Sequence, residues 1–213
     1  MKSAGYWLAL AVVTLGITFA GTAQQSEPSR PATRPADTQP AAAGGGGAYK
    51  IDPLHSSNWF RIRHLNVANF YGRFNEVEGD FTLDDANPAT AGLNVQVKVE
   101  SVDTNNAGRD KHLKSAELFD AEQYPTMAFK SQAVTKLNER DYEVRGELTF
   151  RGVTRPLTVK VTRTGSGPGM RGEFRAGLET TFEIKRSEFG MTALMGGLGD
   201  DVLLTFSLEG VRQ

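Results

Sequence analysis

The sequence of 213 residues contains no cysteine. Disulfide bonds, thiolate metal sites and thiol catalysis are therefore excluded together, and so is attachment of a lipid to a cysteine. Histidine is scarce, with only His55, His64 and His112. A metal site needs clustered ligands. On one uninterrupted strand His55 and His64 would face opposite sides, and His112 lies in a different segment. We therefore expect neither a metal nor a cofactor.

A strong excess of charge and the common catalytic motifs are also lacking. The formal net charge is −1, which does not suggest a nucleic-acid partner. The sequence has no G-x-S-x-G, P-loop or Rossmann glycine pattern, and no nucleophile is paired with a recognisable base. The adjacent carboxylates of Asp200 and Asp201 would point to opposite faces of a strand. We expect a protein that is not an enzyme.

A long uncharged run occurs at the N-terminus, from Tyr6 to Ala20, after Lys2 and before the small residues Gly21-Thr22-Ala23. This order is typical of a secretory signal peptide at residues 1–23, cut after Ala23. The mature protein would then be periplasmic or secreted. The alternative is an uncleaved segment that tethers the protein to a membrane, because residues 3–23 are just long enough to span a bilayer.

Large apolar residues are missing from residues 24–48, which contain four prolines and then an Ala-Gly tract. Such a segment cannot bury enough surface to offset its backbone entropy, so we expect a disordered spacer. Residues 49–213 form one domain by size and are long enough to bury a core without disulfides.

Alternation of apolar and polar residues dominates this domain, as in residues 93–99, 142–150, 157–161, 174–184 and 202–208. This period is typical of antiparallel strands with one wet face. About eight such strands with hairpin links predict a closed all-β barrel. The apolar parity slips near Asn75-Glu76, which predicts a bulge or sharp bend. We also expect a flexible hairpin turn at residues 165–169.

Residues 102–131 interrupt the strand pattern. They begin with a polar turn, continue as a helix-like piece at residues 108–118, and return to a strand only after Tyr124-Pro125. A long excursion within a small β domain usually covers or closes something. We expect this segment to cap the barrel.

Several short motifs, in this order and spacing, resemble the YceI-like family of secreted, lipocalin-like polyisoprenoid-binding proteins. They are Ile51-Asp52-Pro53-x-His55-Ser56, Phe60-x-Ile62-x-His64-Leu65, Gly72-x-Phe74, Ser101-Val102-Asp103-Thr104, Arg109-Asp110-x-His112-Leu113, Phe119-Asp120, Tyr124-Pro125, Phe129-x-Ser131, Gly146-x-Leu148-Thr149-x-x-Gly152-Val153-Thr154-x-Pro156 and Arg186-Ser187-x-Phe189-Gly190-Met191. The resemblance covers residues 49–210. Trp59 and Lys185 depart from the family pattern, and the spacer is not part of it.

The resemblance implies an antiparallel eight-stranded lipocalin-like barrel with a short helical excursion between strands and a lengthwise apolar cavity. The implied function is binding, storage or transport of a polyisoprenoid, an isoprenoid quinone or a fatty-acyl lipid. Transient contact with a membrane and formation of a homodimer are further partner hypotheses. The residues expected to contact the ligand are Phe60, Ile62, His64, Phe70, Phe74, Arg109, His112, Leu113, Phe119, Phe129, Phe150, Leu178, Phe182, Phe189 and Met191.

Some roles have two interpretations. Arg109 either binds an anionic head group or forms an ion pair with Asp103 or Asp110 that fixes the cap. His64 is expected inside the barrel as a hydrogen-bonded core histidine. For the whole chain, the alternatives are a packed barrel that acts as a stress-related or surface interaction protein, and an enzyme acting on a lipid or quinone.

Overall fold

The computed structural model describes residues 46–213. The predicted signal peptide and most of the predicted spacer lie outside the described residues. The first strand, β1 (Gly47–Ile51), begins two residues before the predicted domain start. Gly47 and Ala48 belong to the sheet because they pair with Leu83 and Thr82. Within the described part of the chain, no helix has the length and apolar character needed to cross a membrane.

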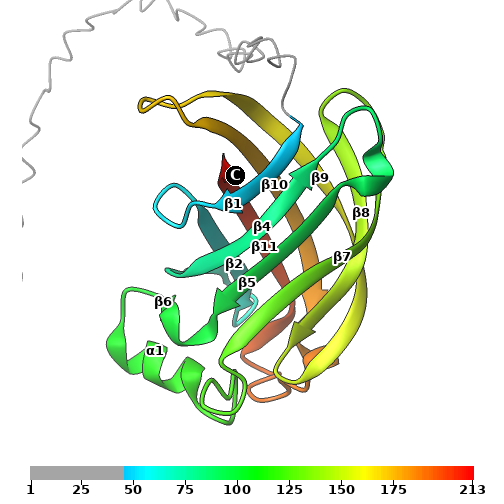
Figure 1. Cartoon of the computed structure of the whole chain (residues 1–213). Coiled ribbons are helices and arrows are strands. Elements are labelled where there is room, and N and C mark those ends of the chain that lie inside the picture. The colour runs from blue at the N-terminus through cyan, green and yellow to red at the C-terminus, as the bar shows by residue number, and fades with distance from the viewer. Residues whose placement is uncertain (1–45) are drawn as a thin grey trace, which may run out of the picture. The chain divides into compact units, whose positions relative to one another are not determined.

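The remaining strands are β2 (Ser57–His64), β3 (Ala68–Phe74), β4 (Val77–Leu83), β5 (Gly92–Lys98), β6 (Val102–Asp103), β7 (Thr126–Lys136), β8 (Asp141–Phe150), β9 (Val153–Pro168), β10 (Phe174–Lys185) and β11 (Leu198–Arg212). Neighbours pair antiparallel in the order β1-β4-β5-β7-β8-β9-β10-β11, and β11 pairs back with β1. This closes an eight-stranded ring (Figure 1). The predicted all-β barrel is confirmed.

The ring is extended at one end by β2, β3 and β6. Asn75 and Glu76 separate β3 from β4 at the predicted parity slip, and both backbone N–H groups donate to Ser101, at 3.0 Å each. The Asn58 amide bonds both backbone groups of Phe74 just before this bend. β5 pairs with β7, whereas β6 pairs only with β3 among the described strands. At the end of the barrel formed with β2, β3 and β6, no backbone pairing joins β6 to β7, so the sheet is open between these two strands.

The predicted excursion occupies this opening. It contains α1 (Ala107–Lys114), which lies at the lower end of the barrel in Figure 1. Asn106 caps its N-terminus by accepting from the Arg109 backbone N–H at 2.9 Å. The helix ends four residues earlier than predicted because Ser115 is extended and its hydroxyl bonds the His112 carbonyl. Short 3₁₀ turns span Pro88–Thr90, Val99–Ser101 and Arg186–Phe189.

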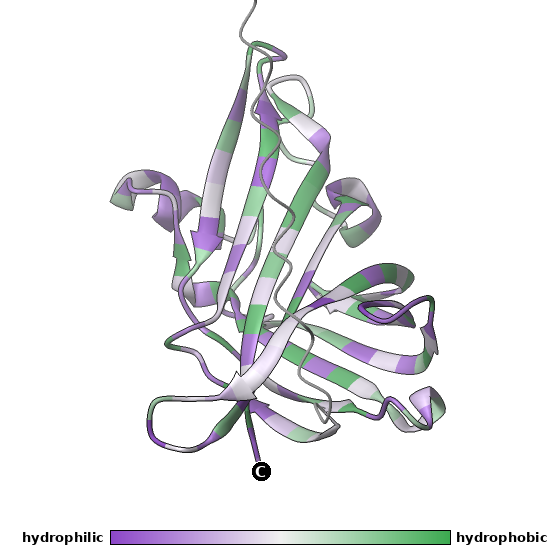
Figure 2. Cartoon of the chain, turned by 90° about the horizontal axis from the view of Figure 1, so that it is seen from above, coloured by the Kyte–Doolittle hydropathy of each residue, from purple (hydrophilic) through white to green (hydrophobic). Residues whose placement is uncertain are grey.

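The alternating residues form the core as predicted. Most inward positions of the long strands are buried, among them Val95, Val144, Val159, Leu178 and Leu208, and others, such as Phe182, are partly buried and pack against them. Figure 2 shows the alternation of hydrophobic and hydrophilic residues along the strands. Where the ring closes, Tyr49 of β1 is fully buried and stacks on Phe81 of β4, with ring centroids 4.9 Å apart.

The predicted hairpin turn at residues 165–169 is wrong in position. β9 continues to Pro168, and the turn follows at Gly169–Gly172, where the Gly172 N–H bonds the Gly169 carbonyl. The glycines instead accompany a register shift in the β9–β10 ladder opposite Gly177. The extra residue at this shift is Thr164, and its hydroxyl would lie 2.3 Å from a Cβ at position 177, so the shift requires a glycine at this position.

Candidate ligand-binding site

A cavity of about 250 Å³ lies beneath α1, at the end of the barrel that the excursion covers. Its walls come from α1, from the segment after α1, and from the ends of β2, β3, β7, β8, β10 and β11. The lining residues are Phe60, Ile62, His64, Phe70, Phe74, Arg109, His112, Leu113, Leu118, Phe119, Met127, Phe150, Ile184, Arg186, Met191, Leu194, Leu198, Val202 and Leu204. Most are apolar, so the cavity suits an apolar occupant.

Aromatic rings form a continuous wall along this cavity. Phe60 contacts Phe74, Phe74 contacts Phe119, and Phe119 contacts Phe150, with centroid separations of 5.8, 5.9 and 5.5 Å. All three pairs are tilted, which is a favourable aromatic geometry. Phe119 comes from the excursion and the others from strands. The cap is therefore packed into the wall rather than laid over it.

Polar contacts fix the start of the cap. The Asp110 carboxylate accepts from the Thr104 backbone N–H at 2.9 Å and from the Thr104 hydroxyl at 2.5 Å. Arg109 donates to the same Thr104 through Nε and Nη2, at 2.8 and 2.7 Å. Neither of the ion pairs proposed for Arg109 is its observed contact, because Asp103 instead pairs with Arg73 at 2.9 Å. Arg109 holds the cap through Thr104.

A buried arginine forms the opposite side of the cavity. Arg186 is 4% exposed and donates to the carbonyls of Gly199, Met191, Ala193 and Leu198, at 2.7–3.2 Å. Burial lowers the pKa of its guanidinium, and the nearby Asp200 charge opposes that shift. The single side chain thus ties together both ends of the turn that joins the 3₁₀ turn at 186–189 to β11.

The mouth of the cavity carries the polar groups. The Arg109 guanidinium lies over the Phe70 ring, 4.4 Å from its centroid. His112 contacts Glu117 at 2.8 Å, and His64 is exposed at the end of β2. The lining of this cavity contains four titratable residues, two arginines and two histidines, and no carboxylate. The lining therefore favours an anionic over a cationic group.

Eleven of the residues expected to contact a ligand line this cavity, and four do not. Phe129 and Phe182 border a separate void of about 40 Å³ deeper in the barrel. Leu178 is packed in the core, and Phe189 is 1% exposed behind Phe150. The expected lengthwise cavity is interrupted because large side chains fill the barrel beyond Met127, including the stacked pair of Phe182 and Phe206.

His64 was expected in the core, but it is exposed at the rim. β2 ends at this residue and the chain turns immediately afterwards, so the side chain lies at the barrel edge. The lining residues that are not among the expected ligand contacts are Leu118, Met127, Ile184, Arg186, Leu194, Leu198, Val202 and Leu204. Ile184, Val202 and Leu204 belong to the apolar strand faces that alternation predicts to point inward, and Leu118 belongs to the predicted cap, where it is expected to face the interior. Leu194 lies in a turn, where no periodicity marks it.

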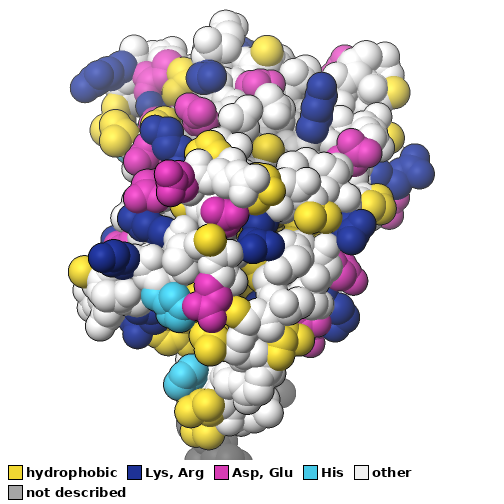
Figure 3. Space-filling model, turned by 90° about the horizontal axis from the view of Figure 1, so that it is seen from below, with side chains coloured by type: hydrophobic (Ala, Val, Ile, Leu, Met, Phe, Trp, Pro, Cys, Tyr) yellow, Lys and Arg dark blue, Asp and Glu magenta, His cyan; other side chains and the backbone are white. Residues whose placement is uncertain are grey.

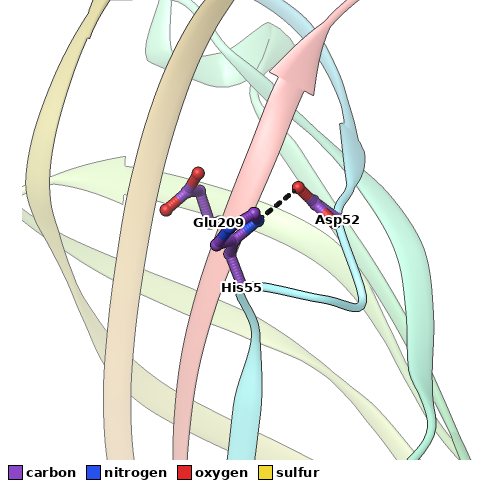
Figure 4. A group of neighbouring side chains, drawn as sticks. All are labelled: Asp52, His55 and Glu209. Carbon is purple, nitrogen blue, oxygen red and sulfur yellow. Dashed lines mark hydrogen bonds and ion pairs between the residues drawn. The ribbon is translucent and has the colours of Figure 1, made fainter. Parts of the chain in front are cut away.

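A second polar group lies away from the cavity. Asp52, His55 and Glu209 place their ligand-type atoms within 4.8 Å of one another (Figure 4). Arg175 already contacts both carboxylates through Nη1, and Asp52 bonds His55 at 2.7 Å. The hydrogen bonds from His55 and Arg175 lower the pKa of Asp52 to about 2. The arginine occupies the position that a cation would need, so the geometry is that of an ion-pair network.

The chain matches the model of the YceI-like domain over residues 49–210. The chain belongs to the YceI-like family. A UPF0312 protein of Yersinia enterocolitica is 43% identical over 77% of this chain and 86% of its own length. A UPF0312 protein of Pseudomonas aeruginosa is 41% identical over 78% of this chain and 87% of its own. The recognition of the family from short motifs is confirmed.

Three solved structures have the same fold. The Campylobacter jejuni YceI protein is 29% identical, with a TM-score of 0.64, over 71% of this chain and 90% of its own. BcnA of Burkholderia cenocepacia gives a TM-score of 0.68 at 23% identity, and the match covers 75% of this chain and 98% of BcnA. A polyisoprenoid binding domain of Saccharophagus degradans gives a TM-score of 0.63 at 14% identity, and the match covers 78% of this chain and 98% of that domain. The last two likenesses show the fold alone.

Proposed function

We propose that this YceI-like protein binds a long apolar molecule in the cavity beneath α1, to store or carry it without catalysing a reaction. The ligand class is a polyisoprenoid, an isoprenoid quinone or a fatty-acyl lipid. The observation that carries the proposal is a preformed cavity of about 250 Å³ with a mostly apolar lining and polar groups at its mouth. The choice of ligand class follows the family resemblance of the short motifs, and a polyisoprenoid binding domain of Saccharophagus degradans has the same fold.

The volume of the cavity together with its apolar lining separates this function from that of a packed interaction barrel. At about 30 Å³ for each water, 250 Å³ corresponds to roughly eight water volumes. A barrel that acts only through its outer surface needs no such space. A chain methylene takes up a volume similar to that of a water, so the cavity holds about eight carbons of a chain. A longer ligand would extend through the mouth or past Met127.

The head group of the ligand would lie at the mouth. Arg109, His64 and His112 are the titratable side chains there, and a guanidinium suits a phosphate or carboxylate. Because Arg109 is already oriented by Thr104 and Phe70, little side-chain entropy would be lost when it binds an anion. We propose an anionic or polar head group at this position.

Lipid extraction tests the proposal directly. Full-length protein purified from its native host is extracted with organic solvent, and the extract is quantified by mass spectrometry. A stoichiometric apolar lipid is expected. Ile62→Trp should fill the cavity and lower the lipid content, whereas Arg61→Trp, on the opposite face of β2, should retain it. Absence of lipid from the wild type, or equal content in both variants, would contradict the proposal.

Export is proposed on the N-terminal sequence. If residues 1–23 are a signal peptide, protein recovered from the periplasm or medium of its host should begin at Gln24. N-terminal sequencing of that material checks the prediction. An intact Met1 on membrane-bound protein would instead establish the uncleaved tether.

A further inference from the structure

Four exposed apolar side chains surround the mouth of the cavity on two turns. Leu65 and Val67, in the β2–β3 turn, are 58% and 81% exposed. Leu194 and Met195, in the turn before β11, are 49% and 47% exposed. The Leu65 N–H donates to the Gly197 carbonyl at 2.7 Å, so the two turns are joined. Figure 3 views this end of the molecule, where hydrophobic side chains stand among charged ones.

The backbone of both turns is held in an unusual conformation. Leu65, Asn66 and Leu194 have φ values of 50°, 53° and 57°. The left-handed region is accommodated by asparagine but is uncommon for a bulky residue such as leucine. Since Leu65 is mostly exposed, packing in the core does not account for a leucine there. Strained residues of this kind often mark functional surfaces.

The apolar surface of these turns continues the cavity outward. His64 and Leu194 line the cavity, and their chain neighbours Leu65 and Met195 stand outside it. The exposed Arg63 places a cation beside these side chains. Its Nη2 donates to the carbonyl of Asn66, in the β2–β3 turn, at 2.7 Å. A guanidinium beside projecting apolar side chains is the combination that favours an anionic membrane surface.

We propose that this rim, defined as Leu65, Val67, Leu194 and Met195 with Arg63, docks the cavity mouth onto an anionic lipid bilayer. The ligand then passes between bilayer and cavity without exposing its chain to water. This inference rests on the proposed function. A bilayer fits better than a protein acceptor because the apolar side chains project from two turns among polar neighbours, an arrangement suited to insertion between head groups.

The test uses the absence of cysteine from the chain. Full-length Val67→Cys is labelled with a polarity-sensitive fluorophore and titrated with phosphatidylcholine vesicles, with and without phosphatidylglycerol. We expect a blue shift that phosphatidylglycerol strengthens. The matched control is Met170→Cys, fully exposed in the turn between β9 and β10, which should show none. Because each probe reports its own surroundings, membrane binding by the N-terminal segment does not mimic the result.

A second variant tests the apolar contact. Leu65→Asn, in the labelled Val67→Cys background, suits the left-handed φ and does not alter the cavity lining. It should weaken vesicle affinity about tenfold, with an unchanged thermal unfolding temperature. Absence of a shift at position 67, an equal shift at position 170, or unchanged affinity of the Leu65 variant would overturn the docking proposal. Copurified lipid would still uphold the proposed function in that case, so the two can fail separately.

Discussion

At the scale of single residues, Arg186 explains why the motif Arg186-Ser187-x-Phe189-Gly190-Met191 stands beside the cavity. Its guanidinium serves four carbonyls of the turn that leads into β11. Ser187 bonds Asp200 through its backbone N–H and its hydroxyl, and Gly190 adopts a φ of 75° that suits glycine. The motif builds one wall of the site before any ligand is considered.

Replacing this arginine should therefore destabilise the fold. Arg186→Met leaves buried carbonyls without donors, and we expect the free energy of unfolding to fall by about 3 kcal/mol. Arg186→Lys should recover little, because an ammonium cannot reproduce the planar fork. Urea unfolding measures both variants, with the exposed Arg171→Met as the control. A loss of less than about 0.5 kcal/mol in Arg186→Met would contradict this role.

A second residue-scale prediction concerns acid stability. Asp85 accepts from Arg163, which is 6% exposed, at 2.8 Å, and also from Lys136 and Tyr142. The hydrogen bond from Arg163 is the largest cause that lowers the pKa of Asp85 from 3.8 to about 2. A lowered folded-state pKa stabilises the fold above the unfolded value. That contribution is lost as pH falls from about 4 towards 2.

Asp85→Asn should lower the free energy of unfolding by about 2 kcal/mol at neutral pH, since Arg163 loses its charged partner and Asp85 is partly solvated. The deficit should shrink on acidification across the same range. Urea unfolding at neutral and acidic pH checks this. Asp201→Asn, which breaks a pair with both partners about half exposed, should cost much less. A deficit independent of pH would show that Asp85 acts without its charge.

At the scale of elements, the cap is the part whose stability depends most on individual polar contacts. α1 has only eight residues and no buried side chain of its own, so it is too short to be stable alone. Asp110→Ala removes both bonds to Thr104, whose backbone N–H is then left without this acceptor. We expect the free energy of opening the cap to fall by about 1–3 kcal/mol.

Hydrogen exchange measured by mass spectrometry checks this prediction. Amides of residues 104–119 should exchange faster in Asp110→Ala, while β8 to β11 keep their protection. Lys111→Ala, on an exposed position of the same helix, is the control. Equal loss of protection across the whole barrel would show that the cap unfolds only with the fold.

The strands and the cap differ in how far the sequence predicts them. Alternation placed Val95, Leu148 and Leu204 correctly because burial of one sheet face imposes a period of two. It could not place the end of β9, because glycine suits a bulge as well as a turn. The sequence predicts an ion pair or an anionic head group as the partner of Arg109, whereas its guanidinium donates to the hydroxyl and the carbonyl of Thr104. Such contacts depend on tertiary geometry that a local pattern does not contain.

At the scale of the whole molecule, the two ends of the barrel differ in structure: one is closed by strand pairing, and the other is open and covered by the excursion. The β1 edge closes the ring through the buried Tyr49 and its stack on Phe81. The opposite end is opened by the bend at Asn75-Glu76 and then covered by the excursion. The cavity lies at this covered end because the ring is incomplete there, whereas large side chains fill the interior of the complete ring except for the void of about 40 Å³.

Met127 lies between these two regions, since it lines both the cavity beneath α1 and the deeper void of about 40 Å³. In the wild type, fatty-acid affinity should rise with chain length to about eight carbons and then level off. Met127→Ala should join the two spaces, so that affinity continues to rise with longer chains. The deletion should cost about 2–4 kcal/mol of stability. Displacement of a fluorescent fatty acid, measured over a series of chain lengths, gives the profile.

The matched control is Met191→Ala, because Met191 is equally buried and lines the cavity beneath α1 but not the deeper void. It should lose similar stability and widen the cavity without lengthening it. Its affinity should therefore level off at about the wild-type chain length. If both variants extended the profile equally, added volume rather than the position of Met127 would set the accepted length. The barrel interior would then not act as a stop for the ligand chain.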